Sequence, residues 1–265
     1  MKKVKNILFM LVALIYIIVV SGFISTKEKT RRIGEIKIRI TDSTKNQFIK
    51  KADIEKILEA NKFNPVGNGM SELNLEKIEN ALKNRQIVRD AEIFVTEPGI
   101  VRVEISQKTP FVRIFNRYGQ GYYLDREGNI IPLSTGFSPF VIVASGYISE
   151  PFQVTRTLNI MEVKHDSISR SLHTIYDVYR LADFITHDDF LNSQFEQIYV
   201  NNKYEFELIP RVGSHVIELG RVENLEEKFE NLKILYEKGL NNLGWNQYDK
   251  ISLKYKNQVV CTKIQ

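Results

Sequence analysis

The chain has 265 residues, 43% of them hydrophobic, which is enough apolar side chain for one large or two modest domains. Three of its 37 basic residues lie in the first 25 positions, so the rest of the chain carries 34 basic against 32 acidic residues. This near balance, without a basic cluster that has interleaved aromatic residues, argues against a nucleic-acid-binding protein. The single cysteine, Cys261, excludes an internal disulfide framework and a cysteine-based zinc site.

The segment 7–24, which reads ILFMLVALIYIIVVSGFI, contains no charged side chain. At about 1.5 Å per residue it would form a helix of roughly 27 Å, close to the ~30 Å hydrocarbon thickness of a bilayer. Three lysines precede it, as in a cleaved signal peptide, but the run exceeds the usual ~7–15 apolar residues and lacks a small-residue cleavage site. We therefore expect a retained transmembrane helix at 7–24, between a tail at 1–6 and a linker at 25–32.

The charges around this helix do not fix its orientation. Four basic residues follow it, including Arg31 and Arg32, and they outnumber the three lysines before it. The positive-inside rule therefore gives no clear answer. The side of the membrane on which the following domains fold has to be inferred from the family that those domains resemble.

Residues 33–109 show the order strand, helix, helix, strand, strand. Ile36, Ile38 and Ile40 alternate with charged residues, which predicts a strand with one buried face. Apolar residues at helical spacing predict short helices over 53–61 and from residue 75 to 82, the second capped by Ser71 or Asn74. Alternation returns over 88–106 on both sides of a Glu-Pro-Gly turn, which is typical of a hairpin.

This order of elements resembles a POTRA domain. The phrase NRQIVRDA at 84–91 is similar to the entry into the hairpin of that family, and VEISQKTP at 103–110 is similar to its exit. Two helices covering one face of a three-stranded sheet would bury the apolar stripe of each. The resemblance implies a POTRA-like β-α-α-β-β domain at 33–109.

Residues 110–265 predict a β-rich domain with an antiparallel sheet and amphipathic helices. A strand at 111–115, a hairpin at 122–131 and a buried strand at 140–144 come first, followed by a helix that includes Ile175 and Ala182. Strands from Phe195, joined by a tight Asn201-Asn202 turn, continue to residue 219 as a meander.

A second helix and a hairpin are predicted at the end of this domain. Asn224 and Glu227 have the spacing of a capping box at the start of the helix, and Gly244 stands where the helix should end. Strands at 251–256 and 259–264 then flank Asn257-Gln258 and form the final hairpin.

The whole order, an anchor helix, a POTRA-like module and then a β domain, resembles the FtsQ/DivIB family of bacterial cell-division proteins. The phrase Tyr123-Leu124-Asp125, with Gly128 and Ile130, is similar to the hairpin that opens the β domain of that family, and ISLKY at 251–255 with VV at 259–260 is similar to its closing strands. The chain is thereby identified as an α+β member of that family, in which the short tail and the long segment at 145–190 are departures.

This resemblance implies a non-enzymatic membrane scaffold of the divisome that binds FtsL and FtsB/DivIC-type single-span proteins and supports septal cell-wall synthesis. It also implies a single-pass protein of the cytoplasmic membrane, with both domains outside the cytoplasm and at the division septum. An edge hairpin offers unpaired backbone groups to which another chain can add a strand. We expect the partner-binding residues at this hairpin, with Tyr255 as the aromatic anchor; they are Leu253, Lys254, Tyr255, Lys256, Asn257, Gln258, Val259 and Val260.

Other functions have less support in the sequence. The histidines and acids at 165–166, 173 and 187–189 fit no metal-binding or acid-base spacing, so solvated polar surfaces explain them better, and we expect no cofactor. A membrane-anchored hydrolase lacks a nucleophile motif such as GxSxG. A POTRA-bearing protein of outer-membrane assembly or export would need a following membrane β-barrel, and no series of ~10-residue alternating strands is evident.

Overall fold

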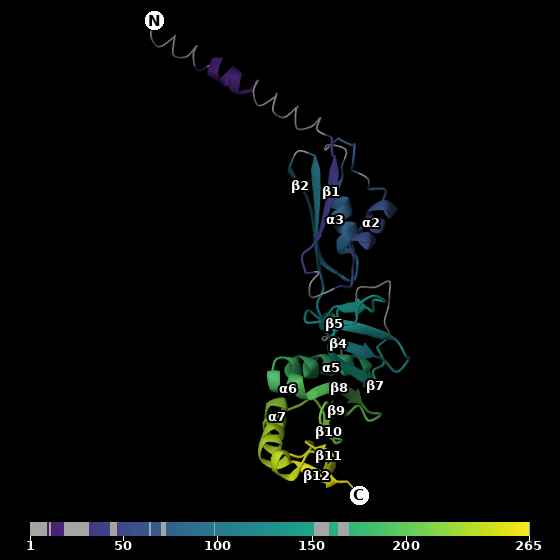
Figure 1. Cartoon of the computed structure of the whole chain (residues 1–265), viewed down its shortest axis with the longest axis vertical. Coiled ribbons are helices and arrows are strands. Elements are labelled where there is room, and N and C mark those ends of the chain that lie inside the picture. Colours follow the sequence, from purple (N-terminus) through teal and green to yellow (C-terminus); the bar gives the residue numbers. More distant parts are fainter. Residues whose placement is uncertain are drawn as a thin grey trace. The chain divides into compact units, whose positions relative to one another are not determined.

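The structure is a computed structural model that describes residues 10, 12–18, 32–42, 47–63, 65–69, 73–97, 99–150, 159–163 and 170–264, except for the side chains of 162, 163, 170–173 and 243. The chain divides into two compact units, Met1–Gln107 and Lys108–Gln265 (Figure 1). Most of the segment expected to cross the membrane lies outside the described residues. Its described residues, 10 and 12–18, are helical, and none of the described helices is both long and apolar enough to span a bilayer.

From residue 35 onward, the first unit has the predicted element order. Its elements are β1 (Glu35–Ile40), α2 (Lys51–Ala60), α3 (Leu75–Lys83), β2 (Val88–Glu97) and β3 (Ile100–Gln107). The three strands form one sheet in the order β1-β3-β2, in which β3 runs parallel to β1 and antiparallel to β2. The predicted hairpin and the two predicted helices are confirmed.

Both helices of this unit pack their apolar residues into one core. Ile54 and Leu58 of α2 and Ile78 and Leu82 of α3 are buried with the inward-facing residues of the sheet. The side chain of Asn74 accepts a hydrogen bond of 2.9 Å from the Lys77 backbone N–H, so Asn74 is the N-cap of α3. Ser71, the other predicted cap, lies outside the described residues.

The described strands of the second unit form one nine-stranded sheet, in the order β12-β11-β10-β9-β8-β7-β4-β5-β6. They are β4 (Pro110–Phe115), β5 (Gly121–Asp125), β6 (Ile130–Pro132), β7 (Ile142–Gly146), β8 (Phe195–Val200), β9 (Phe206–Pro210), β10 (Val216–Gly220), β11 (Tyr248–Ser252) and β12 (Val260–Lys263). The helices are α4 (Ile160–Val163), α5 (Arg170–Thr186), α6 (Asp189–Gln194), α7 (Leu225–Ile234), the π-helical η2 (Leu235–Leu240) and α8 (Asn241–Leu243).

The expectation of an antiparallel sheet is wrong for part of this unit. Strand β7 pairs in parallel with β4 and β8, and β11 pairs in parallel with β10, while the meander β8-β9-β10 is antiparallel as predicted. Parallel neighbours need a long crossover. Helix α5 lies within the crossover from β7 to β8, and helix α7 within the crossover from β10 to β11.

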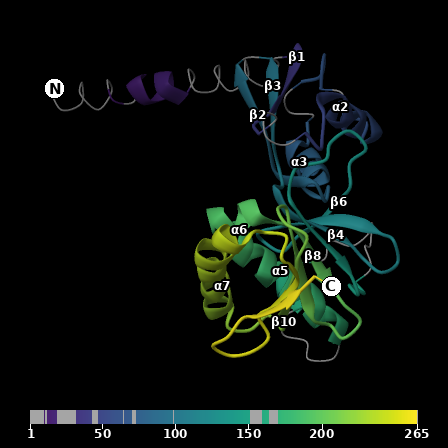
Figure 2. The same cartoon turned by 60° about the horizontal axis from the view of Figure 1, so that its bottom comes forward.

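The long helices pack on one side of the sheet (Figure 2). Ile175, Leu181 and Ile185 of α5 share a core with Phe229 and Leu232 of α7 and with alternate residues of the central strands. Each residue between two core positions of a strand therefore faces away from the helices. The sheet thus has one face buried under helices and a second face that carries more polar residues.

Three local expectations are corrected by this structure. Phe140 precedes β7 and its side chain is 86% exposed, so the apolar run at 140–144 is only partly a buried strand. The turn between β8 and β9 spans 201–205 and places Tyr204 at a φ of 59°, so it is longer than two residues. Asn224 adopts a left-handed conformation and its side chain makes no cap hydrogen bond, so the predicted capping box is not formed.

The carboxylate of Glu150 is buried in the second unit. Glu150 is 6% exposed, and its Oε1 accepts a hydrogen bond of 3.2 Å from the backbone N–H of Ile175 in α5. Its Oε2 is buried and has no hydrogen-bond partner among the described residues. Burial raises the pKa of Glu150 to about 7, because the charged form loses its hydration.

Candidate partner-binding site at the C-terminal hairpin

The C-terminal hairpin forms one edge of the nine-stranded sheet. Strand β11 pairs with β10 on one side and β12 on the other, with Ser252 opposite Val260 and Ile251 opposite Cys261. Among the described strands, β12 pairs only with β11. Alternate residues of such an edge strand point their backbone N–H and C=O groups away from the sheet, so β12 presents a row of groups that another strand can use.

The eight residues expected to bind a partner have three different environments. Leu253 is 2% exposed and belongs to the core, and its N–H donates a hydrogen bond of 2.9 Å to the Glu218 carbonyl. Residues 254–259 form the connection between the strands. Val260 is the first residue of β12 and is 42% exposed. Of the eight residues predicted to bind a partner, only Val260 therefore lies in the edge strand β12.

Lys254 ties this connection to the turn between β8 and β9. Its Nζ lies 2.7 Å from Oε2 of Glu205 and 3.9 Å from Oε2 of Glu218. The hydrogen bond to Glu205 raises the pKa of Lys254, and the same bond lowers the pKa of the Glu205 carboxyl. The Lys254 side chain thus attaches the connection to the turn before β9 and to β10.

A small groove separates this connection from the start of α7. Its volume is about 130 Å³, and Leu253, Tyr255 and Val259 lie on one side, with Glu227 and Asn231 of α7 on the other. Asn257 has a φ of 58°, and its N–H donates a hydrogen bond of 3.3 Å to Oε1 of Glu227. Helix α7 and the connection therefore form the two walls of one groove and are joined by this hydrogen bond.

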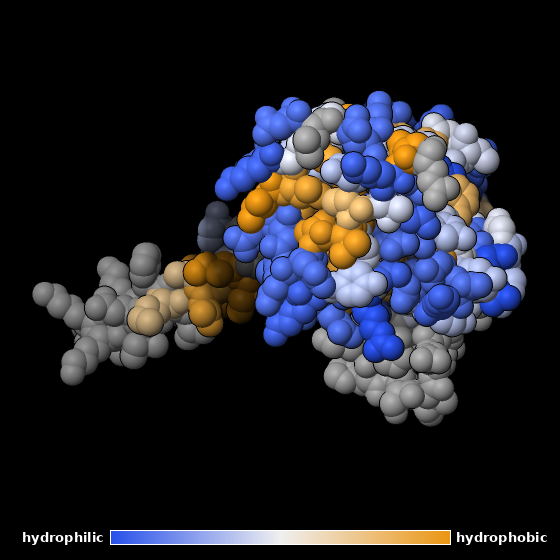
Figure 3. Space-filling view, turned by 90° about the horizontal axis from the view of Figure 1, so that it is seen from below, coloured by the Kyte–Doolittle hydropathy of each residue, from blue (hydrophilic) through white to orange (hydrophobic). Residues whose placement is uncertain are grey.

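Exposed apolar side chains follow this surface. Tyr255 is 55% exposed, and Val260 and Ile264 are also exposed. Figure 3 looks at the end of the second unit that carries β11 and β12, where hydrophobic side chains lie in small groups among hydrophilic ones. An exposed aromatic residue beside an open strand edge is a suitable anchor for a partner chain, because aromatic residues contribute strongly to binding.

The sequence did not indicate that α7 and β10 contribute to this surface. Glu227 was identified only as part of a capping box, whereas in the structure it contacts Asn257, thirty residues further along the chain. Glu218 contacts Lys254 through the parallel pairing of β10 with β11. Local periodicity gives no signal for such pairings, so these residues could be found only in the folded chain.

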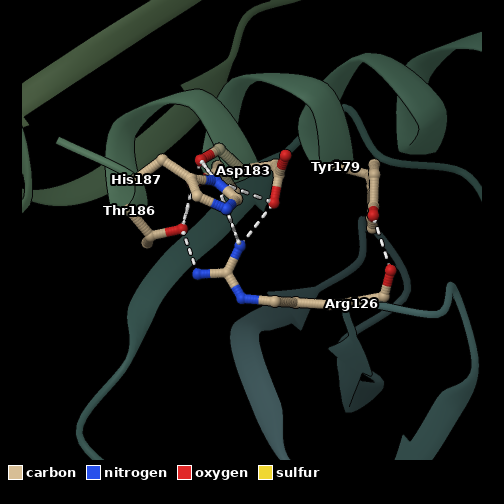
Figure 4. Close-up of polar contacts among 6 residues, drawn as sticks. Arg126, Tyr179, Asp183, Thr186 and His187 are labelled. Atoms are coloured by element: carbon tan, nitrogen blue, oxygen red, sulfur yellow. Dashed lines mark hydrogen bonds and ion pairs between the residues drawn. The ribbon is translucent and has the colours of Figure 1, made fainter.

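The polar residues at 187–189 stabilise the fold. Among the described residues, no group of three or more His, Cys, Asp or Glu side chains could hold a metal ion. Asp188 caps α6 and forms an ion pair with Lys233 of α7. His187 lies 3.2 Å from the guanidinium of Arg126, which also contacts Asp183 and donates a hydrogen bond of 3.1 Å to Thr186 (Figure 4).

This cluster attaches the turn after β5 to α5. The Tyr179 hydroxyl donates a hydrogen bond of 2.7 Å to the Arg126 carbonyl (Figure 4). The Arg126 guanidinium lies 5.1 Å from the centre of the Phe111 ring. The side chain and the backbone carbonyl of Arg126 thus both contact α5. Residues 165 and 166 and the side chain of His173, which were weighed as metal ligands, lie outside what the structure describes.

Comparison with known proteins gives two matches that follow one another along the chain. Residues 31–106 match a POTRA-like domain, and residues 109–262 match the domain family described as FtsQ/DivIB, C-terminal related. No curated protein sequence matches the chain. Since the second match covers more than half of the chain and ends within β12, the protein belongs to the FtsQ/DivIB family.

Proposed function

We propose that this protein is a non-enzymatic scaffold of bacterial cell division, held in the cytoplasmic membrane by a single helix at 7–24. Membership of the FtsQ/DivIB family carries the proposal. The POTRA-like domain and the C-terminal domain occur in the order that the family resemblance implies, and both folded units would then lie outside the cytoplasm. The uncharged composition of 7–24 supports the anchor.

The proposed partners are FtsL and FtsB/DivIC-type single-span proteins, through which the protein would support septal cell-wall synthesis. We assign their binding to the C-terminal hairpin. An incoming strand would pair with β12, and the connection at 254–259 would contact the side chains of that strand. The open edge of β12, the exposed Tyr255 and the groove beside α7 support this assignment.

The anchor would add to this binding without making a contact of its own. Confining the hairpin and its single-span partners to one membrane raises their effective concentration. Weak pairing at the edge strand would then be enough for assembly at the septum. Removal of the anchor should accordingly weaken assembly in cells more than binding between isolated domains.

Depletion of the protein in its native bacterium tests the division role. The expected result is filaments with unseparated septa, restored to normal length by a plasmid copy of the full chain. Cells that continue to divide normally after the protein has disappeared would contradict the role in division.

Photo-cross-linking tests the binding site separately. A photoreactive amino acid at Tyr255 should form an adduct with the FtsL or FtsB/DivIC-type protein of the same cell. The same amino acid at Tyr118, which is 63% exposed in the turn between β4 and β5, is the matched control and should form no such adduct. Labelling at Tyr255 that yields only solvent or self adducts would count against the site.

A further inference from the structure

A second surface, on the face of the nine-stranded sheet away from the helices, has the features of a docking site. Arg113 of β4 lies opposite Val143 of β7, and Val143 lies opposite Gln197 of β8. Their neighbours in each strand, including Ile114, Ala144 and Ile198, are buried in the core with the helices. These alternate residues therefore face away from the helices.

A groove of about 550 Å³ runs over these strands. Phe115, Val141 and Val143 give it an apolar lining, and all three are only partly buried. Gln197 donates a hydrogen bond of 2.8 Å to the Ser145 hydroxyl on the same face, so the lining also carries polar groups. A concave surface of this kind fits a chain segment better than it fits a flat bilayer.

Phe140 stands beside the groove as an unusually exposed aromatic residue. Its side chain is 86% exposed, and the guanidinium of Arg211 lies 4.7 Å from the centre of its ring. Large apolar residues at this exposure contribute little to folding. Aromatic residues and arginine are the types most often found at the energetic centre of protein interfaces.

The two arginines of the groove have no carboxylate partner among the described residues. The guanidinium of Arg113 donates one hydrogen bond of 3.3 Å to the Ser138 hydroxyl and lies 4.6 Å from the centre of the Phe115 ring. Its Nε is buried and has no hydrogen-bond partner in the described part of the chain. Arg211 contacts only the Phe140 ring through its guanidinium in the described structure. Against these two positive charges the groove has one carboxylate, Glu196.

We propose that this groove is a docking site for an acidic segment of another protein. A carboxylate of that segment would pair with Arg113 or Arg211, and an adjacent apolar side chain would pack between Phe140 and Val143. Charge complementarity selects the acidic segment, because the bidentate guanidinium group is suited to carboxylates. The site is separate from the C-terminal hairpin and does not depend on the division role.

The test uses the full chain in phosphatidylcholine nanodiscs and two labelled heptapeptides, one alternating glutamate with leucine and the other alternating lysine with leucine. Fluorescence anisotropy should show saturable binding of the acidic peptide and at least tenfold weaker binding of the basic one. The double variant Phe140→Ala, Arg211→Gln should weaken binding of the acidic peptide at least tenfold. Circular dichroism should show an unchanged fold, since both side chains lie outside the core.

Two further variants serve as controls. Arg221→Gln removes an exposed arginine that does not line the groove, and Tyr255→Ala removes the anchor of the C-terminal hairpin. Neither should change binding of the acidic peptide. Equal binding of the two peptides, or unchanged binding in the double variant, would overturn the proposal. Binding of phosphatidylglycerol vesicles that requires Phe140 and Arg211, without binding of either peptide, would assign the groove to lipid and would also overturn it.

Discussion

Lys254 and Glu205 form an ion pair of 2.7 Å between the connection that precedes β12 and the turn that precedes β9. Both side chains are about one-third exposed, so the pair should contribute only about 0.2–1 kcal/mol. We expect Lys254→Met to lower the free energy of unfolding by that amount at pH 7. Urea denaturation followed by the fluorescence of Trp245, the only tryptophan of the chain, measures it.

The pH dependence of this difference follows from the two pKa shifts. Glu205 has a pKa below its ordinary value of 4.5, so its contribution is present above pH 4.5 and is lost as the pH falls through the lowered value. Lys254 has a pKa above its ordinary 10.5, so its contribution is lost only as the pH rises through the raised value. The difference between Lys254→Met and the natural chain should therefore shrink in acid. A difference that stays constant down to pH 2 would exclude this ion pair as its source.

Glu150→Gln should remove a pH dependence that burial creates. The pKa of Glu150 is raised to about 7, so the contribution of Glu150 to stability is highest below its ordinary pKa of 4.5 and is lost as the pH rises through 7. Glutamine keeps an acceptor for the Ile175 N–H but does not ionise. We expect the variant to match the natural chain at pH 4.5 and to be more stable by about 2–3 kcal/mol at pH 8.5. An equal difference at both pH values would contradict this explanation.

Gly146 should not tolerate a side chain, because its backbone closely approaches β8. Its φ is 99°, and a Cβ atom would lie 2.1 Å from the Val200 carbonyl oxygen. We expect Gly146→Ala to cost about 3 kcal/mol or more. Gly119 is the matched control. Its φ is 77°, but apart from its own atoms and its two chain neighbours, no atom of the described residues lies within 4 Å of an added Cβ, so Gly119→Ala should cost only about 1 kcal/mol. Similar costs for the two variants would show that the contact with β8 is not the cause.

Tyr255→Ala should separate binding from folding. Because the side chain is 55% exposed, its truncation should change the free energy of unfolding by less than about 0.5 kcal/mol. Affinity for an FtsB/DivIC-type partner should fall about tenfold or more, which titration calorimetry can measure. An equal loss of affinity in Tyr118→Ala would show that exposed aromatic residues act without regard to their position.

Local patterns in the sequence were enough to predict elements but not their long-range pairing. Apolar residues at helical spacing over 53–61 predicted α2, and Gly244 was correctly predicted to end the helical segment that begins with α7. The parallel pairing of β10 with β11 joins strands on either side of α7, and no property of either strand alone requires it. Sequence reasoning therefore located the final hairpin but could not show which strands surround it.

The candidate partner-binding site, too, could be predicted only in part from local sequence patterns. Alternation over ISLKY at 251–255 predicted a strand that continued to Lys256, yet β11 ends at Ser252 and Leu253 is buried against β10. Burial of Leu253 depends on contacts with residues distant in the sequence, such as Glu218 of β10, which is a tertiary effect. Phe140 was predicted to lie in a buried strand because it is hydrophobic, but its side chain is exposed in the structure. The sequence shows that a side chain is hydrophobic and does not show whether it is buried.

Whether a strand of the partner protein pairs with β12 can be tested most directly by proline substitution in β12. Cys261 and Thr262 are adjacent in an edge strand, so one of them directs its N–H toward β11 and the other directs it outward. Proline at the outward position removes the donor for a partner but leaves the pairing with β11 intact.

We therefore predict that Cys261→Pro and Thr262→Pro behave differently. One of them should keep the free energy of unfolding of the natural chain within about 1 kcal/mol, yet lose at least tenfold in affinity for the extracytoplasmic segment of the FtsB/DivIC-type partner. The other should disturb the hairpin itself. If the variant that folds normally binds the partner as tightly as the natural chain does, strand addition at β12 is wrong.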